Sequence, residues 1–211
     1  MDALSATLIA LDYAAVAVFG ASGALAAARR KHDIITFGFF AAVTGVGGGT
    51  LRDLLIGAPV FWVGRPGYLG VCLAAAVAIW VFGWGRTRGR LLLWLDALGM
   101  ASYSVVGALK ATSLGIQPFS AIVMGVLTAT FGGVIRDVLA SEPSVLLRRE
   151  LYITPALLGA GAFVGLHEAG LAAPIAGAGG FAVAFGVRAG AILFGWQAPA
   201  FPGRGPPPDA A

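Results

Sequence analysis

Charge is scarce in this 211-residue chain, in which only 11% of the residues are charged, against about 25% in an ordinary soluble domain. Hydrophobic residues make up 58% of the chain, and glycine occurs 32 times. Small residues are poor material for a soluble core, but they allow helices to pack closely in lipid. The composition therefore argues against a soluble protein and favours a compact helical bundle in a membrane.

The residues on which most catalytic and cofactor sites depend are also few. Cys72 is the only cysteine, so the chain can form no internal disulfide. His167 lies beside Glu168 with no further His or Cys nearby, so we expect no cofactor and no metal site beyond transient permeating cations. No glycine-rich segment ends in the Gly-Lys-Ser/Thr of a phosphate loop, and no nucleophile has a histidine base, so we expect no enzyme. The basic residues lie in short loops, which argues against nucleic-acid binding.

Seven apolar runs divide the chain. Six of them reach the length of a membrane-spanning helix, about 17 to 25 residues, and the sixth run is shorter, with the least certain limits. Lipid cannot satisfy exposed backbone groups, so helices are the structure we expect for all of them. We predict an all-α membrane protein with seven transmembrane helices in a single transmembrane domain, residues 1–197, followed by a disordered Pro-rich tail, 198–211. The expected spans are Leu4–Ala28, Ile34–Leu55, Tyr68–Trp84, Leu91–Leu109, Pro118–Leu139, Ile153–Leu166 and Pro174–Trp196.

The loop charges predict the orientation of these spans. Arg and Lys are concentrated in the loops after the first, third and fifth runs, which share one side of the membrane, whereas the opposite loops offer mainly Arg65. Because cytoplasmic loops carry the excess of basic residues, the N-terminus is expected outside and the C-terminus in the cytoplasm. The basic residues in this count are Arg29, Arg30, Lys31, Arg86, Arg88, Arg90, Arg148 and Arg149.

An internal repeat appears when the chain is compared with itself at a shift of 84 residues. Residues 11–68 then align with 95–152 without a gap, and 16 of the 58 positions are identical. Each unit holds three spans, so the second unit must have the opposite orientation to the first. We predict an inverted repeat with units at 4–84 and 91–167 and an additional helix at 172–197. Transport sites commonly lie where such units meet.

Glycines interrupt the second and fifth spans at matching positions. Gly47, Gly48 and Gly49 lie in the second span, and Gly132 and Gly133 lie in the fifth. Glycine costs a helix about 1 kcal/mol relative to alanine, so these segments can kink or unwind beside an aqueous path. The alternative is that the glycines only let the two helices cross closely.

Charged residues follow both glycine groups, in the segments GGGTLRD and FGGVIRD. An ionisable side chain facing lipid near the centre of a span costs about 2.5 to 3.5 kcal/mol, so these side chains should point inward. The directions of the spans predict two polar clusters that control the ends of a pore; the alternative is that each Arg merely pairs with a neighbouring acid or snorkels to a headgroup. The expected outer cluster is Asp12, Arg52, Asp53 and Lys110, and the inner one is Asp96, Arg136 and Asp137.

Thr44 and Thr128 precede the glycines by about one helical turn in the two spans. Their hydroxyls are candidates for contact with a permeating ion, although a threonine in a helix also bonds to its own backbone. With the glycines and the charged residues, they complete the predicted pore and gating set.

The two motifs, GVGGGTLRDLL and FGGVIRDVL, resemble those of the trimeric intracellular cation (TRIC) channel family. The resemblance covers about residues 5–197. It implies a homotrimer with one pore per subunit, lined by kinked second and fifth helices, that passes potassium and other monovalent cations. Lys110 stands where animal members use a basic residue in lipid binding and gating, but Ala111 and Thr112 follow it in place of Glu-Val.

The short chain resembles a prokaryotic member, so the expected location is the plasma (inner) membrane, with membrane lipids and monovalent cations as partners. A potassium channel is the first functional hypothesis. A secondary transporter of a small amino acid such as glycine is the alternative, because inverted repeats with broken helices also serve alternating access.

Overall fold

The computed structural model describes residues 3–82, 88–144 and 151–199, which form seven α-helices. Four helices are long and apolar enough to cross a membrane, and α3 is a shorter apolar helix. The all-α architecture predicted from the sequence is confirmed. The helices are α1 (Ala3–Arg29), α2 (Ile34–Leu55), α3 (Gly67–Phe82), α4 (Arg88–Ser113), α5 (Pro118–Leu139), α6 (Ile153–Glu168) and α7 (Ala173–Phe194).

The inverted repeat is visible in the helix boundaries. Helices α2 and α5 begin and end at positions exactly one repeat apart, 34 and 118 at the start and 55 and 139 at the end. Left-handed backbone recurs as well, at Lys31 and Gly115 and again at Gly57 and Ser141. The two three-helix units therefore share details of their turns as well as their helices.

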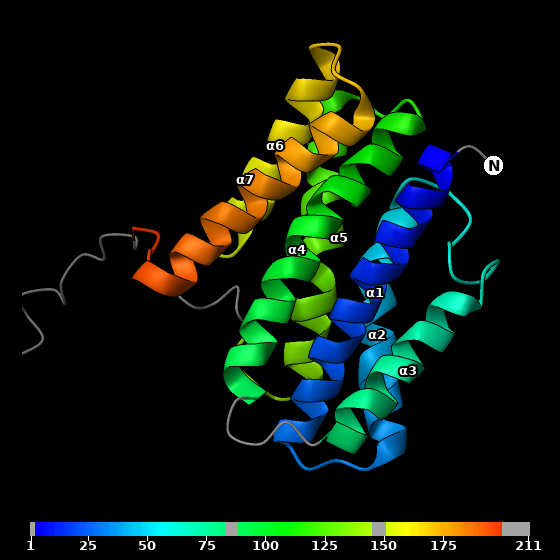
Figure 1. The fold of residues 1–211 in the computed structure, drawn as a ribbon, viewed down its shortest axis with the longest axis vertical. Helices are drawn as coiled ribbons and strands as arrows, with labels where there is room; N and C mark the ends of the chain where they lie inside the picture. Colours follow the sequence, from blue (N-terminus) through cyan, green and yellow to red (C-terminus); the bar gives the residue numbers. More distant parts are fainter. Residues whose placement is uncertain (1–2, 83–87, 145–150, 200–211) are drawn as a thin grey trace, which may run out of the picture.

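The helices form one bundle with α4 and α5 near its middle (Figure 1). Helices α1, α2 and α3 lie on one side of this pair, and α6 and α7 lie on the other (Figure 1). Helix α2 packs against α5, its counterpart in the other repeat, so the two units meet along these helices. This contact places the predicted pore residues at the centre of the molecule.

Helix α2 begins at a capped N-terminus. The carboxylate of Asp33 accepts a hydrogen bond of 2.8 Å from the backbone N–H of Thr36. Such caps satisfy an otherwise unpaired donor in the first turn of a helix. The same bond stabilises the ionised carboxylate and lowers the pKa of Asp33.

Several sequence predictions fall on residues outside the described ranges. Arg86, Arg148 and Arg149 from the loop-charge count lie there, as does most of the Pro-rich tail, 200–211. The orientation of the chain in the membrane and the boundaries of the single transmembrane domain stay predictions.

Candidate functional site

Helices α2 and α5 cross in direct contact at the duplicated glycines. A methyl group added to Gly48 would overlap the carbonyl oxygen of Thr128, and one added to Gly132 would overlap the carbonyl oxygen of Thr44. Residues 44 and 128 are repeat counterparts, as are 48 and 132, so the contact is reciprocal. Both helices are continuous through their glycines, without an unwound turn. Close crossing, which the sequence left as an alternative, therefore occurs here.

The other glycines of the motifs lie against side chains. A methyl group on Gly49 would meet the ring of Phe61 at 2.7 Å, and one on Gly133 would meet the hydroxyl of Tyr152 at 2.5 Å. Gly47 has more room, since its nearest neighbour, a methyl group of Ile135, lies 3.1 Å from the added carbon. The glycines thus make space for groups that surround the crossing.

The two threonines at the crossing are buried but differ in their bonding. Thr128 Oγ1 donates to the carbonyl oxygen of Met124 in its own helix, at 2.6 Å. Thr44 Oγ1 is buried and has no hydrogen-bond partner among the described residues. A hydroxyl in this condition is free to bond to water or to an ion.

Three of the four residues predicted for the outer cluster are joined around Asp53. This carboxylate is fully buried and accepts bonds from Arg52 Nε at 2.8 Å and Lys110 Nζ at 2.7 Å. Its second oxygen accepts the backbone N–H of Phe61 at 3.0 Å. The Arg52 side chain also lies over the Phe61 ring, 5.8 Å from its centroid. Arg52 and Lys110 thus share one carboxylate, and Arg52 pairs with the neighbouring acid, which the sequence left as an alternative.

Asp12, the fourth residue of the predicted outer cluster, binds a group that the sequence did not single out. Its carboxylate accepts a hydrogen bond of 2.6 Å from the hydroxyl of Tyr68 on α3. Arg52 and Lys110 are within electrostatic range of Asp12, but both form ion pairs with Asp53. Tyr68 belongs to the site because its hydroxyl satisfies Asp12.

The inner cluster is assembled around Arg136, whose side chain is fully buried. Its guanidinium bonds to Asp96 at 2.7 Å and to Asp137 at 2.9 Å, which joins α4 to α5. Ser22 of α1 accepts a further bond from the same guanidinium at 3.2 Å. The structure thus brings together all three residues predicted for this cluster.

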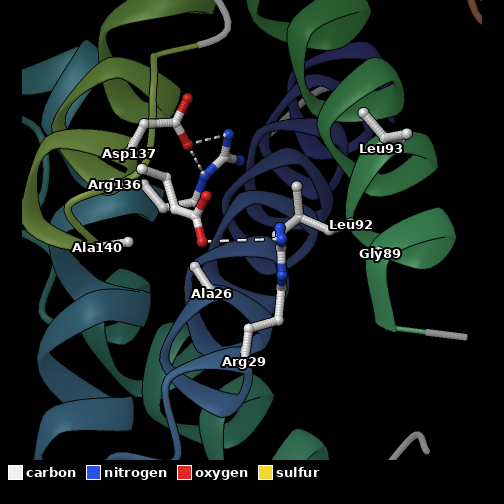
Figure 2. A pocket seen from close by; sticks show the side chains of 9 residues that line it. Ala26, Arg29, Gly89, Leu92, Leu93, Arg136, Asp137 and Ala140 are labelled. Atoms are coloured by element: carbon white, nitrogen blue, oxygen red, sulfur yellow. Dashed lines mark hydrogen bonds and ion pairs between the residues drawn. The ribbon is translucent and has the colours of Figure 1, made fainter. Parts of the chain in front are cut away.

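A cavity of about 230 Å³ opens onto the inner cluster. In Figure 2, Arg136 and Asp137 of α5 lie on one side of it, and Arg29 of α1 and Leu92 of α4 lie on the other. Glu142, just beyond α5, also lines the cavity and pairs with Arg30 at 3.3 Å and with Arg29 at 3.8 Å. Water and ions can therefore approach the buried Arg136 from this end of the molecule.

Sequence reasoning missed three groups that take part in these clusters. Tyr68 and Tyr152 are identical across the repeat, and that match could have marked them as polar partners of Asp12 and Asp96. Arg188 of α7 is completely buried and packs over the Tyr152 ring. Since α7 has no counterpart in the repeat, comparison of the two units offered no signal for Arg188.

Comparison with known proteins matches both repeats to one family. The family model described as "Glycine transporter" matches residues 9–84 and again residues 93–168, two segments that are also 84 positions apart. That description names the family and assigns no substrate to this chain.

Bacterial membrane proteins are among the relatives. A UPF0126 membrane protein of Vibrio cholerae is 40% identical over 157 residues, which are 72% of this chain but 65%, slightly less than two thirds, of the relative. The UPF0126 inner membrane protein YadS of Escherichia coli K12 is 40% identical over 154 residues, 71% of this chain and 73% of YadS.

A solved structure shares the whole fold. The TRIC trimeric intracellular cation channel orthologue from Rhodobacter sphaeroides is 49% identical and has a TM-score of 0.87, covering 90% of this chain and 99% of that one. The fold and the paired buried clusters define a multi-pass α-helical membrane protein of inverted-repeat architecture. The chain belongs to the family that the matching model describes and is a prokaryotic member of the TRIC channel family.

The relatives also support the predicted location, the inner (plasma) membrane of a prokaryote. The solved neighbour is a cation channel, not an enzyme. Transport of cations is therefore the activity class to which the fold and the comparisons point.

Proposed function

We propose that this protein is a monovalent cation channel, with potassium as a permeant ion and one pore in each subunit of a homotrimer. The observation that carries the proposal is the reciprocal crossing of α2 and α5, with an ion-paired cluster of acidic and basic side chains on each side of it. Two helices that meet through glycines, with little side-chain interlocking at the contact, can separate or bend there at low cost. The pore then follows the crossing.

In the proposed pore, the conformation described here is the closed one. Arg136 is fully buried and bound to Asp96 and Asp137 beneath the cavity, so it occupies the route between the cavity and the crossing. When the guanidinium moves aside, the carboxylates remain to attract a cation. The pairing explains how basic residues can line a cation path: in the closed state they plug it, and their charge is cancelled by the acids.

Thr44 and Thr128 lie between the clusters and would contact an ion at the crossing. The unpaired Thr44 hydroxyl supplies one such contact without any loss of an existing bond. On opening we expect α2 and α5 to bend at Gly47, Gly48, Gly49, Gly132 and Gly133, which turns the close contact into a narrow aqueous passage. The charge count across the loops predicts the N-terminus outside, and in that orientation the cavity faces the cytoplasm.

Lys110 distinguishes the outer cluster from the inner one. Its repeat counterpart is Ala26, so the outer cluster has a base at a position where the inner half has alanine. The Lys110 side chain is 29% exposed, whereas Asp53 beneath it is fully buried. Moving one charge through the full membrane field is worth about 2.3 kcal/mol per 100 mV, so displacement of Lys110 would make outer gating depend on voltage.

Purified protein in liposomes tests the channel directly. The expected result is passive flux of potassium and sodium, no chloride flux, and unitary current steps in a planar bilayer. Saturable glycine uptake driven by a proton or sodium gradient, without unitary currents, would instead establish the carrier alternative that the family description suggests. Cross-linking in mild detergent followed by size measurement tests the trimer.

A further inference from the structure

The duplicated tyrosines are held differently in the two repeats. In the first repeat, the ring of Tyr68 stacks on the ring of Tyr13, with centroids 4.0 Å apart and planes 5° from parallel. The stack fixes the Tyr68 ring, and its hydroxyl donates to Asp12 at 2.6 Å. The first repeat therefore provides the ring support from its own helix α1.

In the second repeat, the support comes from outside the repeat. Position 97, the counterpart of Tyr13, is a buried alanine that offers no ring to Tyr152. The guanidinium of Arg188, on α7, lies over the Tyr152 ring instead, 5.2 Å from its centroid. Arg188 also donates to the carbonyl oxygen of Leu151 at 3.0 Å. Two contacts from one buried side chain thus fix Tyr152 at the start of α6.

The aspartates beside these tyrosines also differ in their partners. In the outer half, Tyr68 holds Asp12, and Arg52 is paired with Asp53. In the inner half, Arg136 binds Asp96 at 2.7 Å, and the Tyr152 hydroxyl stands 3.5 Å from the same oxygen. The aspartate thus has the tyrosine as its close donor in the outer half, whereas in the inner half the arginine is the close donor and the tyrosine makes only a long bond.

We propose that Asp96 exchanges Arg136 for Tyr152 when the inner end of the pore opens, and that Arg188 is the positioning residue that makes this exchange possible. A buried carboxylate left without a partner is costly, so Arg136 can leave only if another donor replaces it. Tyr152, held by Arg188 within reach of Asp96, is that donor. The inner half then adopts the pairing already present in the outer half, as units of an inverted repeat can exchange conformations.

This inference rests on the proposed channel function, and it predicts in which direction the open probability changes when Arg188 or Tyr152 is altered. Loss of Arg188 lets the Tyr152 ring move away from Asp96, which then depends on Arg136 alone. The closed pairing is favoured, and the open probability falls. Loss of the Tyr152 hydroxyl has the same effect because it removes the replacement donor itself.

A double-mutant cycle on single channels tests the proposal with Arg188→Met, Tyr152→Phe and the combined variant. Each single substitution should lower the ratio of open to closed time about tenfold, the size expected for groups in contact, with unitary conductance unchanged. The double variant should be no worse than either single one, because both act through the Tyr152 hydroxyl. Arg188→Lys keeps a cation over the Tyr152 ring and should recover part of the open probability. If Arg188→Met does not assemble, Arg188→Lys takes its place in the cycle.

Tyr13→Leu is the matched outer control, since it removes the ring support of Tyr68. When Tyr13→Leu is combined with Tyr152→Phe, the two effects on the ratio of open to closed time should multiply, because the two sites act independently. The proposed exchange at Asp96 is overturned if the effects of Arg188→Met and Tyr152→Phe are independent. It is also overturned if either variant has an unchanged open probability. Neither result contradicts the channel function. A wild-type protein that conducts no cation in the same bilayer overturns the channel, and the exchange with it.

Discussion

Gly48 on α2 lies directly against the backbone carbonyl of Thr128 on α5, with no room for a methyl group between them. The repeat generates the same contact a second time, between Gly132 and Thr44. Neither glycine unwinds its helix. The motif glycines therefore act here by allowing two helices of opposite repeats to touch through their backbones.

Replacing either contact glycine should disturb the crossing. In Gly48→Ala and Gly132→Ala, the new methyl group overlaps a carbonyl oxygen in the opposite helix, which cannot move as a flexible side chain can. Overpacking of this kind costs about 1 to 3 kcal/mol. Thermal unfolding in detergent should show a lower midpoint for both variants.

Gly70→Ala is the matched control, because Gly70 lies in α3 with no atom within 4 Å of the added carbon. Alanine is the better helix former by about 1 kcal/mol, so this variant should be as stable as the wild type or more so. Equal losses in Gly48→Ala and Gly70→Ala would show that the crossing is not the sensitive contact.

The charge of Asp53 should matter more to stability than any other carboxylate in the outer half. Asp53→Ala leaves Arg52 and Lys110 without the carboxylate oxygen that both contact. Removing one partner from a buried ion pair costs about 3 to 5 kcal/mol. Chemical unfolding should detect a loss of that order, whereas Glu142→Gln, which breaks partly exposed pairs, should cost less than about 1 kcal/mol. A similar loss in both variants would contradict the account.

Glu142 and Arg29 should tune conductance in opposite directions. Both line the cavity, so Glu142→Gln removes a charge that attracts cations and Arg29→Gln removes one that repels them. At low ionic strength, the first variant should carry smaller unitary potassium currents than the wild type and the second larger ones. At about 1 M salt, where the Debye length is about 3 Å, both differences should shrink. Changes of the same sign would exclude an electrostatic cause.

Asp33 should contribute a small pH-dependent term to stability. Its pKa is lowered from the ordinary value of 3.8 by the Thr36 N–H bond, so the folded state favours the ionised carboxylate. The contribution is present above that ordinary value and is lost as the pH falls through the lowered pKa. Asp33→Asn keeps a capping oxygen but cannot titrate. Thermal midpoints between about pH 5 and about pH 2 should fall less steeply in this variant; parallel profiles would contradict the prediction.

Much of the fold could be predicted because two independent signals coincide. Hydrophobic length predicts both Ile34–Leu55 and Pro118–Leu139 with the bounds found in the structure, and the 84-residue shift maps one onto the other. The cost of charge in lipid then predicts that Arg52 and Arg136 point inward, and both are buried.

Partner choice within the clusters could not be predicted in the same way. Asp12 and Asp96 occupy matching positions of the repeat, but Asp12 binds Tyr68 and Asp96 binds Arg136. The difference depends on which helix packs behind each tyrosine, and periodicity gives no information on that. Arg188 reaches its site only because α7 packs against α4 and α6.

The most direct test asks whether cations pass between α2 and α5. Cys72 is the only cysteine, so Cys72→Ala supplies a cysteine-free background for Thr44→Cys at the crossing. A cationic thiol reagent added to conducting channels should reduce the unitary current of the Thr44→Cys variant and leave Leu73→Cys, on an exposed part of α3, unaffected. Persistent full-size potassium currents after proven modification of Thr44→Cys would contradict a pore at this crossing.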